Sequence, residues 1–256
     1  MKLAEILHKE LREGKFWTHS RTLVDGCTKV SPGCKNCWSE ALAQRFGNHV
    51  GTYDKGFNGC VIEHPERLAD ILPKSEKRKP RVWTYWNDLF HESVSDELRN
   101  QLFTLITQSK DFHIICTKRP FVALKYLAPK YLTDKLAKPN VIILVSMEDQ
   151  KRANERLPWL AQISTFGWKV GALCEPMLTP IDLTGEWGAY LSGNGPIRKQ
   201  WIDCLSWIVC GPENGSGKRY YDAQWAMRLQ AQAQRANIPF FYKAGLLNEK
   251  EYIETP

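Results

Sequence analysis

Residues 141–149 read VIILVSMED, an apolar run that ends in a serine and is followed within three residues by two carboxylates. Apolar residues without alternation are typical of a parallel strand that is buried on both faces. The run WIVCG at 207–211 has the same character. Both runs therefore predict a parallel sheet that is covered by helices.

Short β-type runs alternate with helical patterns in both directions from this stretch, and such alternation builds βα units. Strands are expected at Thr22–Val24, Arg81–Trp86, Phe112–Cys116, Val141–Ser146, Trp168–Cys174, Ser206–Gly211 and Ile238–Lys243. Helices are expected at Cys37–Phe46, Ser95–Gln108, Phe121–Leu127, Gln150–Ile163 and Asp222–Arg235. We therefore expect one α/β domain over residues 1–256, a partial or complete (β/α) barrel of the TIM-barrel kind. The Gly-rich stretch 184–199 is expected to be an insertion loop or lid.

The composition is that of an ordinary globular protein. The 256 residues are 43% hydrophobic and 25% charged, which excludes a disordered or collagen-like chain. No apolar run reaches the length of a membrane span, and the start, MKLAEILHKELREGKFW, is charged and amphipathic rather than a signal peptide. A cytoplasmic protein that does not enter the membrane is expected.

The formal net charge of +7 favours a polyanionic partner only mildly. The densest basic cluster is either a phosphate-binding surface or a solvated loop, and it consists of Lys74, Lys77, Arg78, Lys79 and Arg81.

Three of the eight cysteines, Cys27, Cys34 and Cys37, have the spacing C-x6-C-x2-C. Three thiolates in one loop can hold a [4Fe–4S] cluster and leave one iron open for S-adenosylmethionine (SAM). Two other interpretations remain open. One is a zinc site completed by Cys60, His49 or His64, and the other is a set of unligated thiols.

The other cysteines indicate packing rather than chemistry. Cys116, Cys174, Cys204 and Cys210 end, adjoin or lie within apolar runs and are interpreted as small buried hydrophobic residues. Cys60 receives no role.

Polar residues follow the expected strands one after another, as a barrel with a site at the carboxyl ends of its strands requires. These residues include the cysteine loop, Asn87-Asp88, Lys118-Arg119, Ser146-Met147-Glu148, Glu175, Glu213-Asn214 and Lys243. Each also has a simpler interpretation. Asp88, Asp149 and Asn214 fit helix caps, Glu148 fits a first-turn carboxylate, and Lys118 and Arg119 fit solvated charges.

The order of these motifs resembles a phage-associated family with a three-cysteine motif, long described as a domain of unknown function and similar to radical SAM enzymes. The resemblance spans most of the chain. It rests on GCTKVSPGCKNCWSEALAQRF, NDLFH at 87–91, TKRP at 117–120, VSMEDQ at 145–150, CEPML at 174–178, the turn at 211–215 and PFFYKAG at 239–245. It implies a radical-SAM-type (β/α) barrel that binds a [4Fe–4S] cluster and SAM. It also implies an isomerase, or aminomutase, that rearranges an amino-acid adduct on thymidine in bacteriophage DNA modification.

Residue roles follow from this resemblance and from position along the chain. Cys27, Cys34 and Cys37 are expected to ligate iron. Asn87 and Asp88 are expected to accept the SAM amine, Ser146 and Glu148 to hold the ribose, and Trp38 to cover the adenine. The residues expected to face the substrate are Lys118, Arg119, Glu175, Glu213 and Lys243.

Departures from the family pattern leave the substrate open. Trp38 stands where Tyr is common, Pro212 and Asn214 alter the sixth strand end, and Ala244 alters the last one. The expected partners are DNA with a modified thymidine and an electron donor such as flavodoxin or ferredoxin, in the host cytoplasm if the protein is phage-encoded. The alternatives are a radical SAM enzyme acting on a peptide, nucleotide or DNA lesion, and a zinc-stabilised nucleic-acid-binding module.

A thymidine inside duplex DNA would have to flip out to reach a barrel mouth. Trp83, Tyr85 and Trp86, or aromatic residues of the 184–199 stretch, are interpreted either as stacking platforms for that base or as core residues. The sequence does not fix the oligomeric state.

Overall fold

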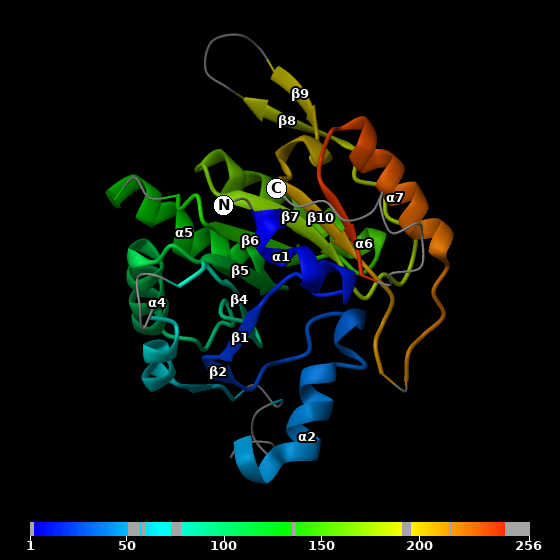
Figure 1. The fold of residues 1–256 in the computed structure, drawn as a ribbon. Helices are drawn as coiled ribbons and strands as arrows, with labels where there is room; N and C mark the ends of the chain where they lie inside the picture. The colour runs from blue at the N-terminus through cyan, green and yellow to red at the C-terminus, as the bar shows by residue number, and fades with distance from the viewer. Residues whose placement is uncertain are drawn as a thin grey trace.

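The main sheet of the protein has seven strands, all of which pair in parallel (Figure 1). The structure, a computed structural model, describes residues 3–50, 57, 60–72, 78–134, 137–190, 196–215 and 217–243. The strand order is β1-β4-β5-β6-β7-β10-β11, which is also their order along the chain. Their bounds are β1 His19–Thr22, β4 Val82–Trp86, β5 Phe112–Thr117, β6 Val141–Ser146, β7 Lys169–Cys174, β10 Trp207–Cys210 and β11 Phe240–Tyr242.

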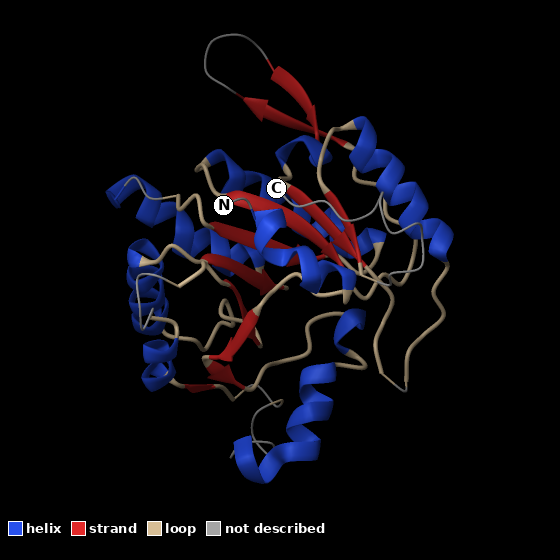
Figure 2. Ribbon diagram, viewed as in Figure 1, coloured by secondary structure: helices blue, strands red, loops and turns tan. Residues whose placement is uncertain are grey.

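Helices connect most successive strands of this sheet (Figure 2). Because the strand order never reverses, right-handed crossovers place these helices on the same face. They are α4 Asp96–Gln108, α5 Pro120–Asp134, α6 Gln150–Thr165 and α7 Ala223–Arg235. The larger hydrophobic cluster of the core joins them to the sheet. An α/β fold with a parallel sheet is thus confirmed.

The first helix, α1 Leu3–Arg12, packs on the other face of the sheet. Its buried residues, Leu3, Leu7 and Leu11, are spaced four apart and so lie on one side of the helix. They join a second hydrophobic cluster with the strand residues Val82, Ile114, Ile142, Leu144, Leu173, Trp207, Val209 and Phe241. The charged amphipathic start of the chain therefore forms a helix that covers this face of the sheet.

The first expected strand, Thr22–Val24, is wrong in its bounds. His19–Thr22 form β1, whereas Val24–Asp25 form β2, which pairs antiparallel with β3 Ile62–Glu63 in a separate small sheet. The residues HSRT of β1 are only partly buried, so this edge strand lacks the apolar run that identifies the inner strands.

The described strands do not close into a complete barrel. β1 and β11 stand at opposite ends of the strand order and do not pair. The segment between α1 and β1 packs beside the end of β11 instead, where a Cβ on Gly14 would lie 2.6 Å from the carbonyl oxygen of Lys243. The sheet is therefore open, with chain packed against its last strand.

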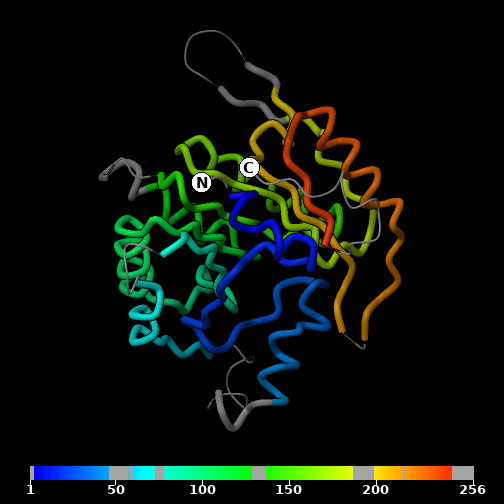
Figure 3. Tube along the Cα trace, viewed as in Figure 1, coloured from blue at the N-terminus to red at the C-terminus, as the bar shows by residue number. Residues whose placement is uncertain are grey.

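The insertion at 184–199 contains a hairpin of β8 Glu186–Tyr190 and β9 Pro196–Gln200, with residues 191–195 outside the described part. Figure 1 shows this hairpin at the end of the molecule opposite α2 Trp38–Val50, and Figure 3 traces the chain in the same view. The short helices in the described part of the chain are η1 Pro32–Cys34, η2 Pro65–Asp70 and η3 Trp201–Cys204. Within the described ranges, no helix is both long enough and apolar enough to span a bilayer.

Gly171 allows close packing in the middle of the sheet, and its replacement should destabilise the protein. A Cβ there would lie 2.5 Å from the carbonyl oxygen of Trp207 and 2.7 Å from Cδ2 of Leu144. We expect Gly171→Ala to lower the free energy of unfolding by about 1–3 kcal/mol through overpacking, measured by denaturant titration. Gly217→Ala is the control, because its nearest contact would be an ordinary 3.6 Å. Equal stability of the two variants would contradict the packing described.

Candidate functional site

A cavity of about 410 Å³ lies between the cysteine loop, residues 26–37, and the carboxyl ends of the strands. This volume is in the range usual for small-molecule and cofactor sites. The cavity is lined by twelve of the thirteen site residues predicted from the sequence: Cys27, Cys34, Cys37, Trp38, Asn87, Asp88, Lys118, Arg119, Ser146, Glu175, Glu213 and Lys243. The thirteenth, Glu148, is buried behind the cysteine loop.

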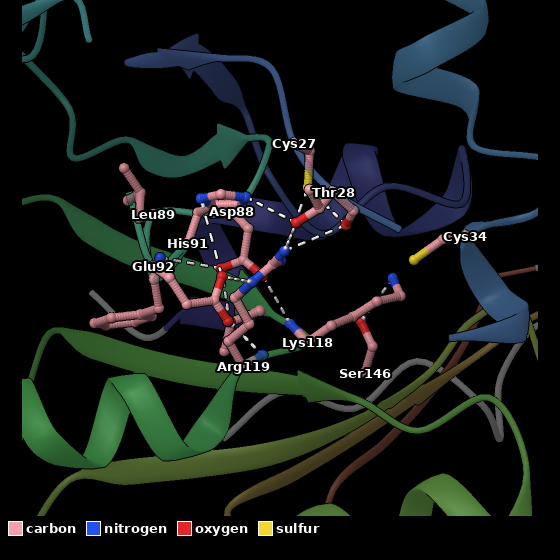
Figure 4. A network of polar contacts seen from close by, with 12 residues as sticks. Cys27, Thr28, Cys34, Asp88, Leu89, His91, Glu92, Lys118, Arg119 and Ser146 are labelled. Carbon is pink, nitrogen blue, oxygen red and sulfur yellow. Dashed lines mark hydrogen bonds and ion pairs between the residues drawn. The ribbon is translucent and has the colours of Figure 1, made fainter. Parts of the chain in front are cut away.

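The three thiols of the cysteine loop are free and half-buried at the cavity wall. Figure 4 shows the sulfur atoms of Cys27 and Cys34 facing the space between them. Within the described part of the chain, no three His, Cys, Asp or Glu side chains converge closely enough to hold one metal ion. In a cubane cluster each thiolate binds a different iron, so its ligands stand farther apart than those of a single ion. Three thiol side chains in one loop are a donor set that either a [4Fe–4S] cluster or a zinc ion can take.

Of the remote residues proposed to complete a zinc site, the two whose side chains are described, His64 and Cys60, do not join these thiols. Both ring nitrogens of His64 are engaged, Nε2 with Asp25 at 2.8 Å and Nδ1 with Glu66 at 2.9 Å. Cys60 is exposed outside the cavity wall, and the side chain of His49 lies outside the described part.

Asp88 joins the ends of β4 and β5. Its Oδ1 accepts hydrogen bonds from the Phe90 amide at 3.0 Å and from Thr117 Oγ1 at 2.7 Å. Its Oδ2 accepts from the Lys118 amide at 3.1 Å and from Arg119 Nη1 at 3.0 Å. Both carboxylate oxygens are therefore fully used within the protein.

Arg119 uses all of its N–H groups to connect this strand end to the cysteine loop (Figure 4). Nε donates to Glu92 at 2.7 Å, and Nη1 donates to Asp88 and to the Cys27 sulfur at 3.8 Å. Nη2 donates to the carbonyl oxygen and the hydroxyl of Thr28, at 3.2 and 2.6 Å. Only arginine has a planar guanidinium group with five N–H donors, which is the number that these contacts need.

The environment of Cys27 disfavours its thiolate. Burial raises the pKa of Cys27 to about 11, Asp88 adds to the rise, and Arg119 opposes it. At neutral pH the thiol is thus protonated, and metal binding there would release a proton.

Glu148 holds the middle of the cysteine loop. Its Oε1 accepts a hydrogen bond from the Gly33 amide at 3.3 Å, and its Oε2 accepts from Arg156 Nη1 at 2.7 Å. Burial raises the pKa of Glu148, but Arg156, the Ser31 hydroxyl and Lys118 outweigh it, so the pKa lies below its ordinary value. A Cβ on Gly33 would lie 3.0 Å from the Glu148 carboxyl carbon, so the loop passes directly over this carboxylate.

Glu213 holds the end of the same loop through Asn36 and Arg219. It accepts hydrogen bonds from Asn36 Nδ2 at 3.0 Å and from Nε and the amide of Arg219 at 2.9 and 3.0 Å, and it pairs with Arg219 Nη2. Arg219 also donates to the carbonyl oxygen of Pro32 at 3.0 Å. The hydrogen bond from Arg219 lowers the pKa of Glu213 to about 2.

Lys118, Glu175 and Lys243 are the charged residues that face the cavity without binding the cysteine loop. Lys243 Nζ donates to both oxygens of Glu175, at 2.6 and 2.7 Å, and lies over the rings of Phe16 and Trp17 at 5.4 Å each. Lys118 Nζ makes one long hydrogen bond, 3.4 Å, to Ser146 Oγ. Lys118 is therefore the charged group with the most capacity left for a ligand.

Asn87 and Trp38 border the cavity mouth. Asn87 has a φ of +60°, a conformation that asparagine tolerates better than most residues, and its amide donates to Val24 and accepts from Ser39, both at 2.7 Å. Trp38 is 49% exposed and meets Trp86 edge to face with centroids 5.0 Å apart.

Residues 15–253 match a family described as "Protein of unknown function (DUF5131)". The chain belongs to this family. No curated protein and no solved structure matches it.

Several residues of this DUF5131 chain that were considered as nucleic-acid contacts have other positions or partners in the structure. Trp83 and Tyr85 are each 4% exposed and belong to the core. Of the three aromatic residues, Tyr85 and Trp86 line the cavity and Trp83 does not. Arg78, in the expected basic cluster, pairs with the buried Asp111 at 2.6 Å. Lys74 and Lys77 lie outside the described residues, and no described residue of 184–200 lines the cavity.

The cysteines outside the loop are mostly packing residues, as expected. Cys174 and Cys210 are buried, and burial raises the pKa of Cys174 to about 12. Cys204 is only half-buried, and Cys116 reaches the cavity wall. Asp149 is the N-cap of α6, since it accepts a hydrogen bond from the Arg152 amide at 2.7 Å.

Several contacts of the cysteine loop in this DUF5131 chain were not predicted from the sequence. Within the loop they involve Thr28, Gly33 and Asn36, and outside it His91, Arg156 and Arg219. His91 is the last residue of the NDLFH motif. Its Nδ1 accepts from the Ser93 amide at 3.1 Å, which leaves Nε2–H to donate to the Thr28 hydroxyl at 2.8 Å.

Replacing Arg119 by Lys should destabilise the cysteine loop even though the charge is kept. A lysine cannot reproduce the fork, so Asp88 loses its buried donor, and we expect a loss of about 3 kcal/mol in the free energy of unfolding by denaturant titration. Arg152→Lys is the control, because its pair with Glu155 is partly exposed and should cost less than about 0.5 kcal/mol. Arg119→Lys with the stability of the parent protein would refute this role.

Glu213 should contribute a stability term that disappears in acid. Its pKa is held near 2, below the ordinary 4.5, so its contribution is complete above about pH 4.5 and is lost as the pH falls toward 2. We expect Glu213→Gln to lower the unfolding temperature at pH 7 and to flatten its decline between these pH values, followed by circular dichroism. Glu155→Gln, at an exposed pair, should keep the parental slope. A parental slope in Glu213→Gln would contradict the assignment.

Proposed function

We propose that this DUF5131 protein is a radical SAM enzyme that binds a [4Fe–4S] cluster through Cys27, Cys34 and Cys37. Its proposed reaction is the rearrangement of an amino-acid adduct on thymidine in DNA, as in bacteriophage DNA modification. The observation that carries the proposal is the meeting of these thiols with the polar strand-end residues around one cavity.

The sheet supports this proposal in its finer form, a partial (β/α) barrel of the radical SAM type. Its strands follow one another in chain order, and all their carboxyl ends point to one edge. A site at that edge is what barrel enzymes use.

The bound cluster and SAM would supply a 5′-deoxyadenosyl radical, which can abstract a hydrogen atom that acid/base chemistry cannot remove. The chain's residues bind, orient and shield. Asn87 Oδ1, which accepts one hydrogen bond from Ser39, has capacity left for the SAM amine. Ser146 Oγ is available to the ribose and Trp38 to the adenine.

The predicted charged residues divide into two groups. Asp88, Glu148 and Glu213 are engaged in the contacts that position the cysteine loop, and so is Arg119. Lys118, Glu175 and Lys243 face the cavity and are the proposed contacts of the substrate. Of these, Lys118 suits a carboxylate or phosphate oxygen and Glu175 suits an amine.

The proposal includes the cytoplasm as location, that of the host if the protein is phage-encoded, and an electron donor such as flavodoxin or ferredoxin. The same site would serve a radical SAM enzyme acting on a peptide, a free nucleotide or a DNA lesion.

Binding of a [4Fe–4S] cluster and of SAM is tested by anaerobic reconstitution, followed by metal analysis and electron paramagnetic resonance. A [4Fe–4S]⁺ signal that shifts on adding SAM is expected. One zinc per chain without a response to SAM would instead favour a zinc-stabilised binding module.

Replacing Cys34 by Ala should abolish both the cluster and its response to SAM, because two thiolates then remain in the loop. Cys204→Ala is the matched control, since Cys204 lies on η3, outside the cavity wall, and hydrogen-bonds the Trp201 carbonyl at 3.0 Å. It should retain the parental iron and sulfide content. Full iron content and SAM cleavage in Cys34→Ala would disprove the assignment of the ligands.

A further inference from the structure

Two loops meet at the cavity mouth and form what we call the loop rim, which consists of Lys35, Lys218 and Tyr220. The junction between the loops is a hydrogen bond of 2.7 Å from Asn36 Nδ2 to the carbonyl oxygen of Gly217. Lys35 and Lys218 directly adjoin these two residues in the chain. Asn36 lines the cavity, so the rim borders its opening.

The lysines of the loop rim are exposed and have no ion pair among the described residues. The other cations of this region are engaged, Lys29 with Glu40 at 2.8 Å and Arg219 with Glu213. Glu213, the glutamate of the second loop, is buried and is neutralised by its pair with Arg219. The rim therefore presents two uncompensated positive charges beside the cavity.

Tyr220 adds a large exposed ring to these charges. It is 77% exposed and is supported from one side by Trp225, edge to face at 5.9 Å. An aromatic ring held in place but open to solvent, beside two cations, is the combination that binds unpaired nucleotides by stacking and phosphate contact.

We propose that the loop rim binds a nucleic-acid strand whose target nucleotide is out of the duplex stack, with Lys35 and Lys218 on flanking phosphates and Tyr220 stacked on a base. This inference rests on the proposed function and adds how the substrate is held. The cavity lies behind the cysteine loop, so a base still stacked in a duplex does not reach it. Single-stranded DNA is therefore expected to bind more tightly than a matched duplex.

The test uses fluorescence anisotropy of a labelled single-stranded oligonucleotide with the reconstituted protein, over a series of salt concentrations. We expect Lys35→Glu with Lys218→Glu to weaken binding about tenfold or more and to reduce the slope of log affinity against log salt by about 0.7 per lysine. Lys151→Glu with Arg228→Glu makes the same change in net charge at exposed positions on α6 and α7 and should weaken binding much less. Equal losses in the two double variants would overturn the proposal.

Tyr220→Ala should weaken single-strand binding roughly tenfold, and Tyr220→Phe should restore it, because the phenyl ring still stacks. Lys35 lies between two cysteines, so Lys218→Glu alone, outside the cysteine loop, must also weaken binding. Unchanged DNA affinity together with slower reduction by flavodoxin would assign the rim to an electron donor and overturn the proposal. Iron content and the SAM-dependent signal of the same samples report separately on the proposed function.

Discussion

The cysteine loop keeps its shape because charged side chains at three strand ends hold it in place. Arg119 follows β5, Glu148 follows β6 and Glu213 follows β10. Their contacts reach Thr28, Gly33 and Asn36 of the loop. A loop of this composition would otherwise be held mainly by the short helix η1. The residues at these strand ends therefore determine where the three thiols lie.

This arrangement explains why so many charged residues surround a cavity of moderate size. Burying a charge is costly unless it is paired and hydrogen-bonded. Asp88 pairs with Arg119, Glu148 with Arg156, and Glu213 with Arg219. The paired carboxylates form a scaffold, and Lys118 and the Glu175–Lys243 pair remain for ligands.

The sequence predicted where the site lies better than it predicted what each residue does there. Parallel strands that follow one another bring their carboxyl ends to one edge, so position along the chain was enough to group the site residues. Which of them bind the cysteine loop depends on partners far away in the sequence, such as Arg219, 187 residues from Pro32. The inner strands were visible as apolar runs, whereas β1 was misplaced because HSRT is polar and only partly buried.

The long reach of these contacts has a consequence for the assembly of the protein during synthesis. The cysteine loop is made early, but its contacts lie 91, 115, 177 and 187 residues later in the chain. Such non-local contacts form late in folding. The thiols therefore remain outside their final site until the segment after β10 has left the ribosome. During that interval they stay accessible to oxidants and to metal ions in solution.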